Sequence, residues 1–583
     1  MASDEPSALE PAHLSVPVSA PASAPISALI DAGNDAFLRG EFTLAHARFD
    51  QAVEAAARHP ATLDLRTQAL INRASTADRM GDHPAAVASF REALGLCERL
   101  AGTAAAEDPI VAAAVTVLRA SALVNLSQAL LNTGDLTAAL RALEQARELL
   151  DPKDEILPED TADLFIGALV ALTALTIQRE EWSRAHELAA ESLDVVLRHR
   201  PALAGRPLMN LSAVHIATGR PELGEDFAYQ AIAAFEASDT PSGVAETRQS
   251  LAQLCLRSGR IAEAEPLLAA SQEFFDRAGM AHQSAFGLDL LGLLAALRGD
   301  QAGAVELYGR SLARFEEAGA LIAAAEVRVR LAAGLHAQRR YDESEAQLAR
   351  AQEAFTRSGL GLRRAQTDFF HAALLEDRVS AGAVGPTGPA LLGRAVALAV
   401  PAALALDAVR FTLANGAQRE RWHRALAEPA MRLAFRLATR AGAADLVAEL
   451  IESRCAGTPL RDAAPGDADT DADTDADTET ATGSGTTEAG GSPGLEPPDF
   501  LHPLAFPGQM DTAAPAHPED PGDAFQLGAA LAGVAAGAGL PVAPPPRLAL
   551  TRTGTTVALA SYLTRAEARY GARIRTARVV PTW

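Results

Sequence analysis

A short pattern that recurs along the first two thirds of the chain constrains the fold more than any other feature. A glycine is followed, at fixed distances, by a small residue, a larger residue and a second small residue. Six copies begin at Gly40, Gly81, Gly134, Gly219, Gly259 and Gly299, and two copies without the glycine begin at Glu180 and Arg339. Neighbouring anchors are 39 to 53 positions apart, and most are close to 40. A fixed period of roughly 20 to 50 residues is typical of stacked supersecondary units, so the chain predicts a solenoid.

Each unit reads as two helices around a turn at the anchor. Before Gly134, Leu123, Leu126 and Leu130 are spaced to lie on one face of a helix. After it, Ala139, Leu143 and Ala146 repeat this spacing with a small, a large and a small side chain. Small residues allow two helices to approach closely, and large ones fill the space between repeats.

The composition agrees with helices throughout. Hydrophobic residues make up 48% of the chain while aromatic residues make up only 5%, which favours packing by Ala and Leu over a β-rich fold. We therefore predict an all-α fold: an α-solenoid of eight helix pairs over residues 26–358, with a further helix around 362–377.

The repeat closely resembles the tetratricopeptide repeat. The resemblance is strongest where Asn125–Leu130 is followed by Gly134-Asp135-Leu136. The standard unit has about 34 residues, so a spacing near 40 implies helices longer by about one turn. The resemblance implies that the first helix of each pair lines a concave face, and that a protein or peptide partner binds there. Self-association through the solenoid ends is a further expectation.

Candidate binding residues follow from that resemblance. Nine residues before the anchor lie Asn72, Asn125 and Asn210, where an asparagine contacts the peptide backbone in peptide-binding members of the family. The alternative is that these asparagines only tie neighbouring helices together, and the sequence leaves both roles open. Repeats seven and eight carry Leu290 and Arg330 instead, so the chemistry changes towards the C-terminal half. The other groove candidates are Arg79, Gln128, Asn132 and Arg206.

No motif predicts catalysis, a cofactor or a metal site. Cys97, Cys255 and Cys455 lack metal-site spacing and are too sparse for a disulfide framework. The alternating aspartates of 467–477 fail the EF-hand signature, which requires glycine and glutamate where Thr474 and Thr480 stand. A Gly-x-Ser-x-Gly string at 490–494 has no strand before it and no helix after it. We therefore predict a protein that is not an enzyme.

Charge and segment length constrain the partner and the compartment. The formal net charge of −23 argues against non-specific nucleic-acid binding. The segment from Arg547 onward, with seven arginines and one acid, is the only place that would support an alternative role as a ligand- or protein-sensing regulator of transcription or signalling. The start lacks a signal peptide, and the apolar run at 395–406 is too short to span a bilayer. We expect no membrane partner and a cytoplasmic location.

Composition divides the chain into five parts. We expect a disordered Ala/Pro/Ser segment at 1–25, the solenoid at 26–378, a helical capping block at 389–460, a disordered acidic linker at 461–522 and a short C-terminal segment with a basic tail at 523–583.

A second resemblance concerns the capping block. Leu406–Phe411, Arg421-Trp422 and Ala448–Glu452 look like a block in actinobacterial proteins whose tetratricopeptide arrays accompany a CHAT domain, a caspase-like peptidase. A single lysine, Lys153, among 51 basic residues is typical of the GC-rich genomes of such bacteria. The His-Gly and Ser-Ala-Cys segments of the peptidase are missing from this sequence. The resemblance therefore implies a non-catalytic companion of a CHAT-type peptidase.

Overall fold

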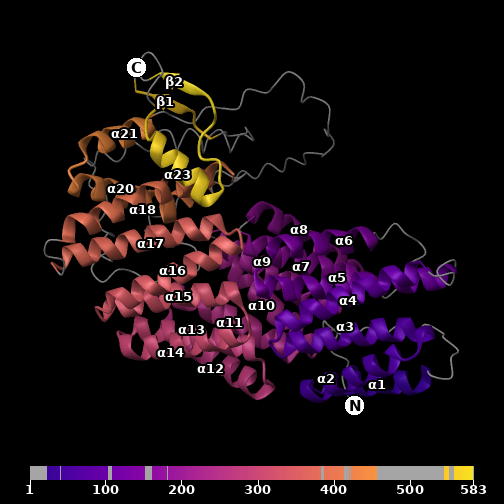
Figure 1. The fold of residues 1–583 in the computed structure, drawn as a ribbon. Coiled ribbons are helices and arrows are strands. Elements are labelled where there is room, and N and C mark those ends of the chain that lie inside the picture. Colours follow the sequence, from indigo (N-terminus) through magenta and orange to yellow (C-terminus); the bar gives the residue numbers. More distant parts are fainter. Residues whose placement is uncertain are drawn as a thin grey trace, which may run out of the picture. The chain divides into compact units, whose positions relative to one another are not determined.

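The computed structural model describes most of the chain in two compact units, the first ending at Leu374 and the second beginning at Leu375 (Figure 1). The described residues are 23–39, 41–102, 108–150, 161–179, 181–218, 220–382, 387–412, 419–420, 422–455, 544–550 and 557–581. The predicted linker at 461–522 and nearly all of the predicted N-terminal segment at 1–25 lie outside these residues.

The first unit confirms the predicted α-solenoid: within the described residues, eight helix pairs follow one another along the chain. The first helices of the pairs are α1 (Ser23–Leu38), α3 (Leu63–Arg79), α5 (Pro109–Thr133), α7 (Thr161–Gln178), α9 (Gly205–Ala217), α11 (Pro241–Arg257), α13 (Ala281–Leu297) and α15 (Leu321–Ala337). The second helices are α2 (Phe42–Ala57), α4 (His83–Ala101), α6 (Leu136–Leu149), α8 (Trp182–His199), α10 (Pro221–Ala237), α12 (Ile261–Ala278), α14 (Gln301–Glu317) and α16 (Tyr341–Arg357). Short 3-10 turns at Pro60–Thr62 and Pro201–Leu203 precede α3 and α9, and α17 (Gly361–Ser380) follows the pairs.

The turn inside a pair is built from the recurring anchor. Gly134 has a φ of +84°, a conformation that favours glycine because a Cβ is strained there. The next residue, Asp135, begins α6 as its N-cap, and its carboxylate accepts a hydrogen bond from the amide of Ala138 at 3.1 Å. Asp82 and Asp300 cap α4 and α14 in the same way. This Gly-Asp pair therefore ends one helix and starts the next.

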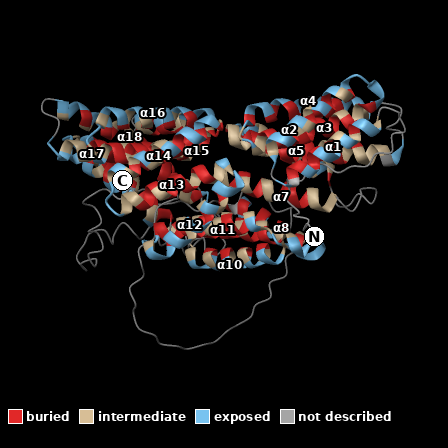
Figure 2. Cartoon of the chain, turned by 90° about the horizontal axis from the view of Figure 1, so that it is seen from below, coloured by how far each residue is buried: buried red, intermediate tan, exposed pale blue. Residues whose placement is uncertain are grey.

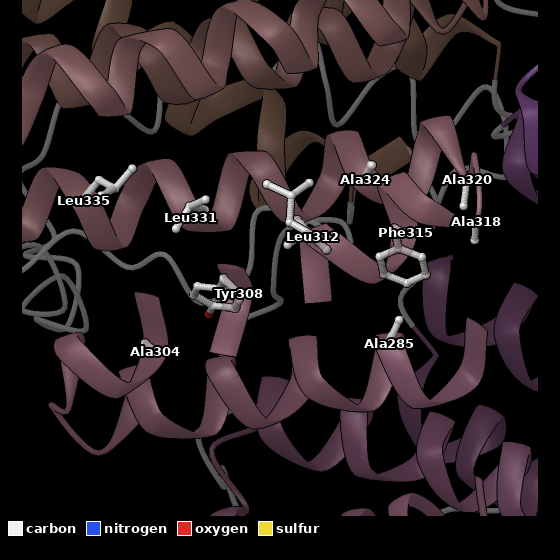
Figure 3. Close-up of a cluster of buried hydrophobic side chains, with 11 residues drawn as sticks. Ala285, Ala304, Tyr308, Leu312, Phe315, Ala318, Ala320, Ala324, Leu331 and Leu335 are labelled. Carbon is white, nitrogen blue, oxygen red and sulfur yellow. The ribbon is translucent and has the colours of Figure 1, made fainter. Parts of the chain in front are cut away.

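The pattern of small and large residues builds the core between repeats. Between α13, α14 and α15, Tyr308 and Phe315 are almost fully buried among alanines and leucines (Figure 3). A Cβ added at Gly292 would lie 2.7 Å from the Tyr308 ring, so the glycine is what allows α13 to approach α14. The small residues at 285 and 304 are buried in the same cluster. The recurring small-large-small pattern therefore specifies the distance between helices.

The first unit also contains a contact that repeat spacing does not predict. Helix α5 contacts α15, five repeats further along the chain. Cβ positions built on Gly81 and Gly134 lie 3.4 Å from the Ala318 Cβ and 3.2 Å from the Leu321 side chain. The solenoid therefore curls until the second and third repeats contact the seventh and eighth, and we call this the closing contact. Figure 2 shows the unit from below: α4, α10 and α16 lie at its outside, and α5, α7, α11 and α13 lie towards its middle.

The second unit is helical with one small sheet. Its elements are the end of α17, α18 (Gly388–Ala408), a 3-10 turn at Val409–Phe411, a π-helical turn η6 (His423–Ala427), α20 (Glu428–Arg440), α21 (Ala444–Cys455), β1 (Arg547–Ala549), α23 (Ala560–Tyr570) and β2 (Val579–Pro581). Helix α18 contacts both α20 and α23. Strands β1 and β2 pair in parallel, with Leu548 opposite Val580. The second unit is still mainly helical, as predicted, and the two strands, each only three residues long, are an addition that the sequence analysis did not contain.

Three helices of the described chain are long and apolar enough to cross a membrane, judged by length and composition only. They are Val111–Thr133, Thr161–Gln178 and Gly388–Phe411. The apolar run at 395–406 is the middle of the last helix, which continues through Pro401, so the length argument from the sequence was wrong there. Inside the protein, 72%, 50% and 61% of the three apolar windows are buried. At least half of each apolar window is therefore covered by other parts of the protein.

Candidate functional site

The first helices of the repeats form one continuous layer. Each of them from α1 to α15 contacts the first helix of the next repeat, while the second helices pack on them from outside (Figure 2). Side chains of the first helices that point away from the second helices therefore line a common surface. We call this surface the inner face. It corresponds to the concave face of the predicted site.

Two of the three predicted asparagines tie helices together. Asn72 is fully buried, and its Nδ2 donates to Oδ1 of Asn34 at 3.0 Å, which links α3 to α1. Asn210 is buried as well, and its Nδ2 donates to the carbonyl oxygen of Val170 at 3.3 Å, which links α9 to α7. Each amide thus forms a hydrogen bond between first helices, as in the second of the two roles considered for these residues.

Asn125 differs from these two in its bonding. It is buried on α5, and its Oδ1 has no hydrogen-bond partner among the residues that the structure describes. A buried acceptor without a partner costs free energy, on the order of 1–3 kcal/mol. Of the three asparagines, Asn125 therefore has the carbonyl oxygen with capacity for an additional donor.

The four neighbouring candidates are all half-buried: Arg79, Gln128, Asn132 and Arg206. The Asn132 amide lies 3.4 Å from Nδ1 of His83, at the start of α4. Arg206 forms an ion pair with Glu246, and its guanidinium lies 5.6 Å from the centre of the Phe235 ring. These four residues are accessible in part, whereas Asn72, Asn125 and Asn210 are buried.

A row of polar side chains links three successive first helices, and of its members the sequence analysis named Arg206 but missed Glu246 and Gln283. Glu246 on α11 accepts from Arg206 on α9, and the Nε2 of Gln283 on α13 lies 3.4 Å from Oε1 of the same carboxylate. We call Arg206, Glu246 and Gln283 the polar row. Arg206 and Glu246 stand 13 residues before their respective anchors, so a shared repeat position was the available signal.

At the C-terminal end of the array, Arg330 occupies the repeat position that holds an asparagine in earlier repeats, and it forms a buried ion pair. Nε of Arg330 donates to Oδ1 of Asp289 at 2.7 Å, and both side chains are buried. Burial raises the pKa of Asp289, and the Arg330 guanidinium opposes that rise. This pair links α15 to α13 and leaves no free charge for a partner at this position.

Histidines cluster at the closing contact. Nδ1 of His83 lies 2.6 Å from Oδ1 of Asp78, and the His83 ring is 6.5 Å from that of His282. The ring of His282 packs edge-on against Phe315 at 5.0 Å. Burial, with a further contribution from His83, lowers the pKa of His282 to about 4. This imidazole is therefore neutral at pH 7 and serves as a packing group.

One cavity of about 300 Å³ lies beside the α10–α11 turn. Its lining is mainly apolar, and Arg248 stands at its edge, 3.7 Å from Glu236. The residues that define it include Phe235, Thr240, Pro241, Val244, Arg248 and Phe274. No local sequence pattern marks this cavity, because its walls come from three different helices.

The possible metal ligands and the thiols of the described residues can be placed directly. Within them, no group of three or more His, Cys, Asp or Glu side chains is arranged to hold a metal ion. Cys97 and Cys255 are buried free thiols, and burial raises the pKa of Cys97 to about 11. The side chain of Cys455 and the motifs at 467–477 and 490–494 lie outside the described residues.

Comparison with known proteins bears on the repeats. Residues 67–99 and 120–149 match the family model of the tetratricopeptide repeat. No curated protein matches the sequence. Among solved structures, the chain is similar to BtubC from P. vanneervenii (21% identity, 38% of this chain and 90% of that one, TM-score 0.29) and to the apo form of RapI (16%, 50% and 98%, TM-score 0.37). It is also similar to the Rap conjugation gene regulator of plasmid pLS20 in complex with the Phr* peptide (12%, 57% and 95%, TM-score 0.43). The match to the tetratricopeptide repeat thus covers residues 67–99 and 120–149, which lie within the α-solenoid.

Proposed function

We propose that this protein is a non-catalytic interaction scaffold that binds a protein or peptide on the inner face of its solenoid. The observation that carries the proposal is the polar row: Arg206, Glu246 and Gln283 connect three first helices across one surface. An extended peptide needs donors and acceptors at regular intervals along its backbone. Amide and carboxylate side chains spaced by the repeat supply both.

The roles of the predicted residues divide by burial. Asn72 and Asn210 hold the first helices in place from within the layer. Gln128, Asn132 and Arg206 are half-buried on first helices, so each of them is accessible in part to a partner. The surface is preformed by helix packing, so a partner meets little ordering cost in the scaffold.

The test is a tagged pull-down of the full chain from its native cell, read by mass spectrometry. The inner-face variant is Gln128→Ala/Asn132→Ala, and the matched control is Arg91→Ala, an exposed residue on α4. A partner that is lost with the inner-face variant and retained with the control supports the proposal. A partner retained by both variants contradicts an inner-face site. Circular dichroism of both variants checks that the fold is intact.

A second candidate, a sensing regulator, is favoured by the closing contact. The contact between α5 and α15 joins two ends of the array that a ligand on the inner face would push apart or draw together. Fluorophores on the exposed Arg91 and Arg339 would report that distance. A transfer efficiency that does not change when the captured partner is added counts against sensing.

The association with a CHAT-type peptidase and the cytoplasmic location are parts of the same proposal. The association rests on the block of sequence from Leu406 to Glu452, and the location is carried over as an expectation. A CHAT-domain protein among the partners that depend on the inner face would support the association. Fractionation of the native cell tests the location.

A further inference from the structure

Five ionisable side chains from separate segments of the second unit come together. Asp407 lies at the end of α18, Arg410 in the turn that follows, His423 on η6, Arg454 on α21 and Arg575 beyond α23. Nε of Arg410 lies 3.1 Å from Oδ1 of Asp407, which is only 2% exposed. The other four groups together hold the pKa of Asp407 below its usual value despite burial. We call these five residues the arginine cluster.

The arginine cluster carries excess positive charge. Three guanidinium groups face one carboxylate, and His423 is held neutral because burial and Arg410 lower its pKa. The net charge is therefore close to +2, in a place where the side chain of Arg575 is only 5% exposed. Uncompensated charge in such surroundings is costly, since water cannot solvate it.

Among the residues that the structure describes, nearby acids do not supply the missing negative charge. Glu567 is bound to Arg547 at 2.8 Å. Glu449 accepts the backbone amide of Leu559 at 2.6 Å. Glu428 pairs with Arg432 at 2.6 Å. Each of these carboxylates already has a partner outside the arginine cluster.

Two donors of the cluster are also left without acceptors. Nη1 of Arg454 and Nδ1 of His423 are buried and have no hydrogen-bond partner among the described residues. His423 as a whole is 8% exposed. By contrast, Arg575 donates to Oγ of Ser453 at 3.1 Å and to the carbonyl oxygen of Ile574 at 3.3 Å. Unused donors and uncompensated charge thus occur in the same cluster.

We propose that the arginine cluster binds a phosphate dianion, either inorganic phosphate or the phosphate group of a monoester. Two negative charges neutralise the excess, and the oxygens accept from the guanidinium of Arg454 and from His423 in its Nδ1–H tautomer. Arginine suits this role because its planar fork of donors matches phosphate geometry. This site is independent of the peptide-binding role proposed for the inner face.

The test uses the full chain in a phosphate-free buffer. Thermal unfolding is followed while inorganic phosphate or glycerol 3-phosphate is added, against sodium chloride at equal ionic strength, and calorimetry measures binding directly. We expect a saturable rise in Tm with phosphate that chloride does not produce. Arg454→Gln should weaken the apparent affinity on the order of tenfold. Arg573→Gln, an exposed arginine of the same segment, should leave it unchanged.

Several results would overturn the proposal. These are no saturable response in the wild type, an equal response to chloride, or an unchanged affinity in Arg454→Gln. A stronger response to succinate than to either phosphate compound would make the site a carboxylate site instead. If Arg454→Gln does not fold, Arg454→Lys keeps the charge and removes the fork, and calorimetry on the wild type still decides. The two phosphate arms distinguish the free ion from the monoester.

Discussion

The imidazole rings of His83 and His282 lie 6.5 Å apart, although one begins the second helix of the second repeat and the other belongs to the first helix of the seventh. Asp78 holds His83 from one side, and Phe315 packs on His282 from the other. The closing contact therefore has a titratable centre, in which the carboxylates of Asp78 and Glu246 lie near the histidines.

Acid should weaken the first unit through His282. Its pKa is about 4 in the folded protein and about 6.5 in an unfolded chain, so between these values the unfolded state binds the extra proton. The contribution of neutral His282 to the free energy of unfolding is therefore complete above pH 6.5, and it is lost as the pH falls towards 4. The loss is at most about 3 kcal/mol, because one pKa unit corresponds to about 1.4 kcal/mol. Asp78 and Glu246 limit this loss, because their carboxylates favour the charged form of His282.

Urea unfolding at pH 7.5 and pH 4.5 measures this effect. His282→Gln cannot titrate, so its free energy of unfolding should fall less between the two pH values than that of the wild type. Comparing the two proteins removes the contribution of the many surface carboxylates. Equal falls in both would show that His282 has no part in acid sensitivity.

Removing the bond between α1 and α3 should destabilise the N-terminal end. Asn72→Ala deletes the amide that donates to Asn34, at an expected cost of about 1–3 kcal/mol. Asn34→Ala should cost a similar amount, and the double variant less than the sum of the two. Chemical unfolding of the three variants tests this. Strict additivity would mean that the two side chains do not depend on each other.

The buried pair of α13 and α15 should behave differently from a surface pair. Arg330→Met leaves the Asp289 carboxylate buried without its partner, at an expected cost of about 3–5 kcal/mol. Arg330→Met/Asp289→Leu should recover part of that loss. Arg277→Met breaks an exposed pair with Glu273 and should cost less than about 1 kcal/mol. Comparable Tm shifts for the buried and the exposed variant would contradict this assignment.

Two glycines should respond in opposite directions to the same substitution. A Cβ on Gly243 would lie 2.5 Å from the ring of Phe235, so Gly243→Ala should cost about 1–3 kcal/mol. A Cβ on Gly309 meets nothing within 4 Å, and this residue lies inside α14. Gly309→Ala should therefore stabilise the protein by about 0.5–1 kcal/mol. Urea midpoints of the two variants decide whether close packing at Phe235 or helix propensity governs each site.

The solenoid was predictable because its signal is local and repeated. Gly134, Asp135 and Ala139 lie within one turn and one helix, and the anchor glycine recurs in six of the eight copies, which leaves little ambiguity. The shared position of Asn72, Asn125 and Asn210 on the first helices could be read from the sequence for the same reason. What Asn72 bonds to was not, because Asn34 belongs to a different repeat and no spacing rule connects the two.

Other features lay beyond any local pattern. The closing contact joins α5 to α15 through turns whose residues look like ordinary turn residues. Strands β1 and β2 are too short to show alternation, and α23 separates them in the chain. The arginine cluster draws on five segments, so only the fold brings Asp407, Arg454 and Arg575 together.

The contact of Gly81 and Gly134 with the turns around Ala318 and Leu321 changes how the array comes apart. In an open solenoid each repeat touches only its neighbours, so the terminal repeats fray first and unfolding spreads inward. Here the second and third repeats are also held by the seventh and eighth, so the intervening repeats form a closed circuit of contacts. A circuit of this kind resists unzipping from one end, and its repeats lose their structure together.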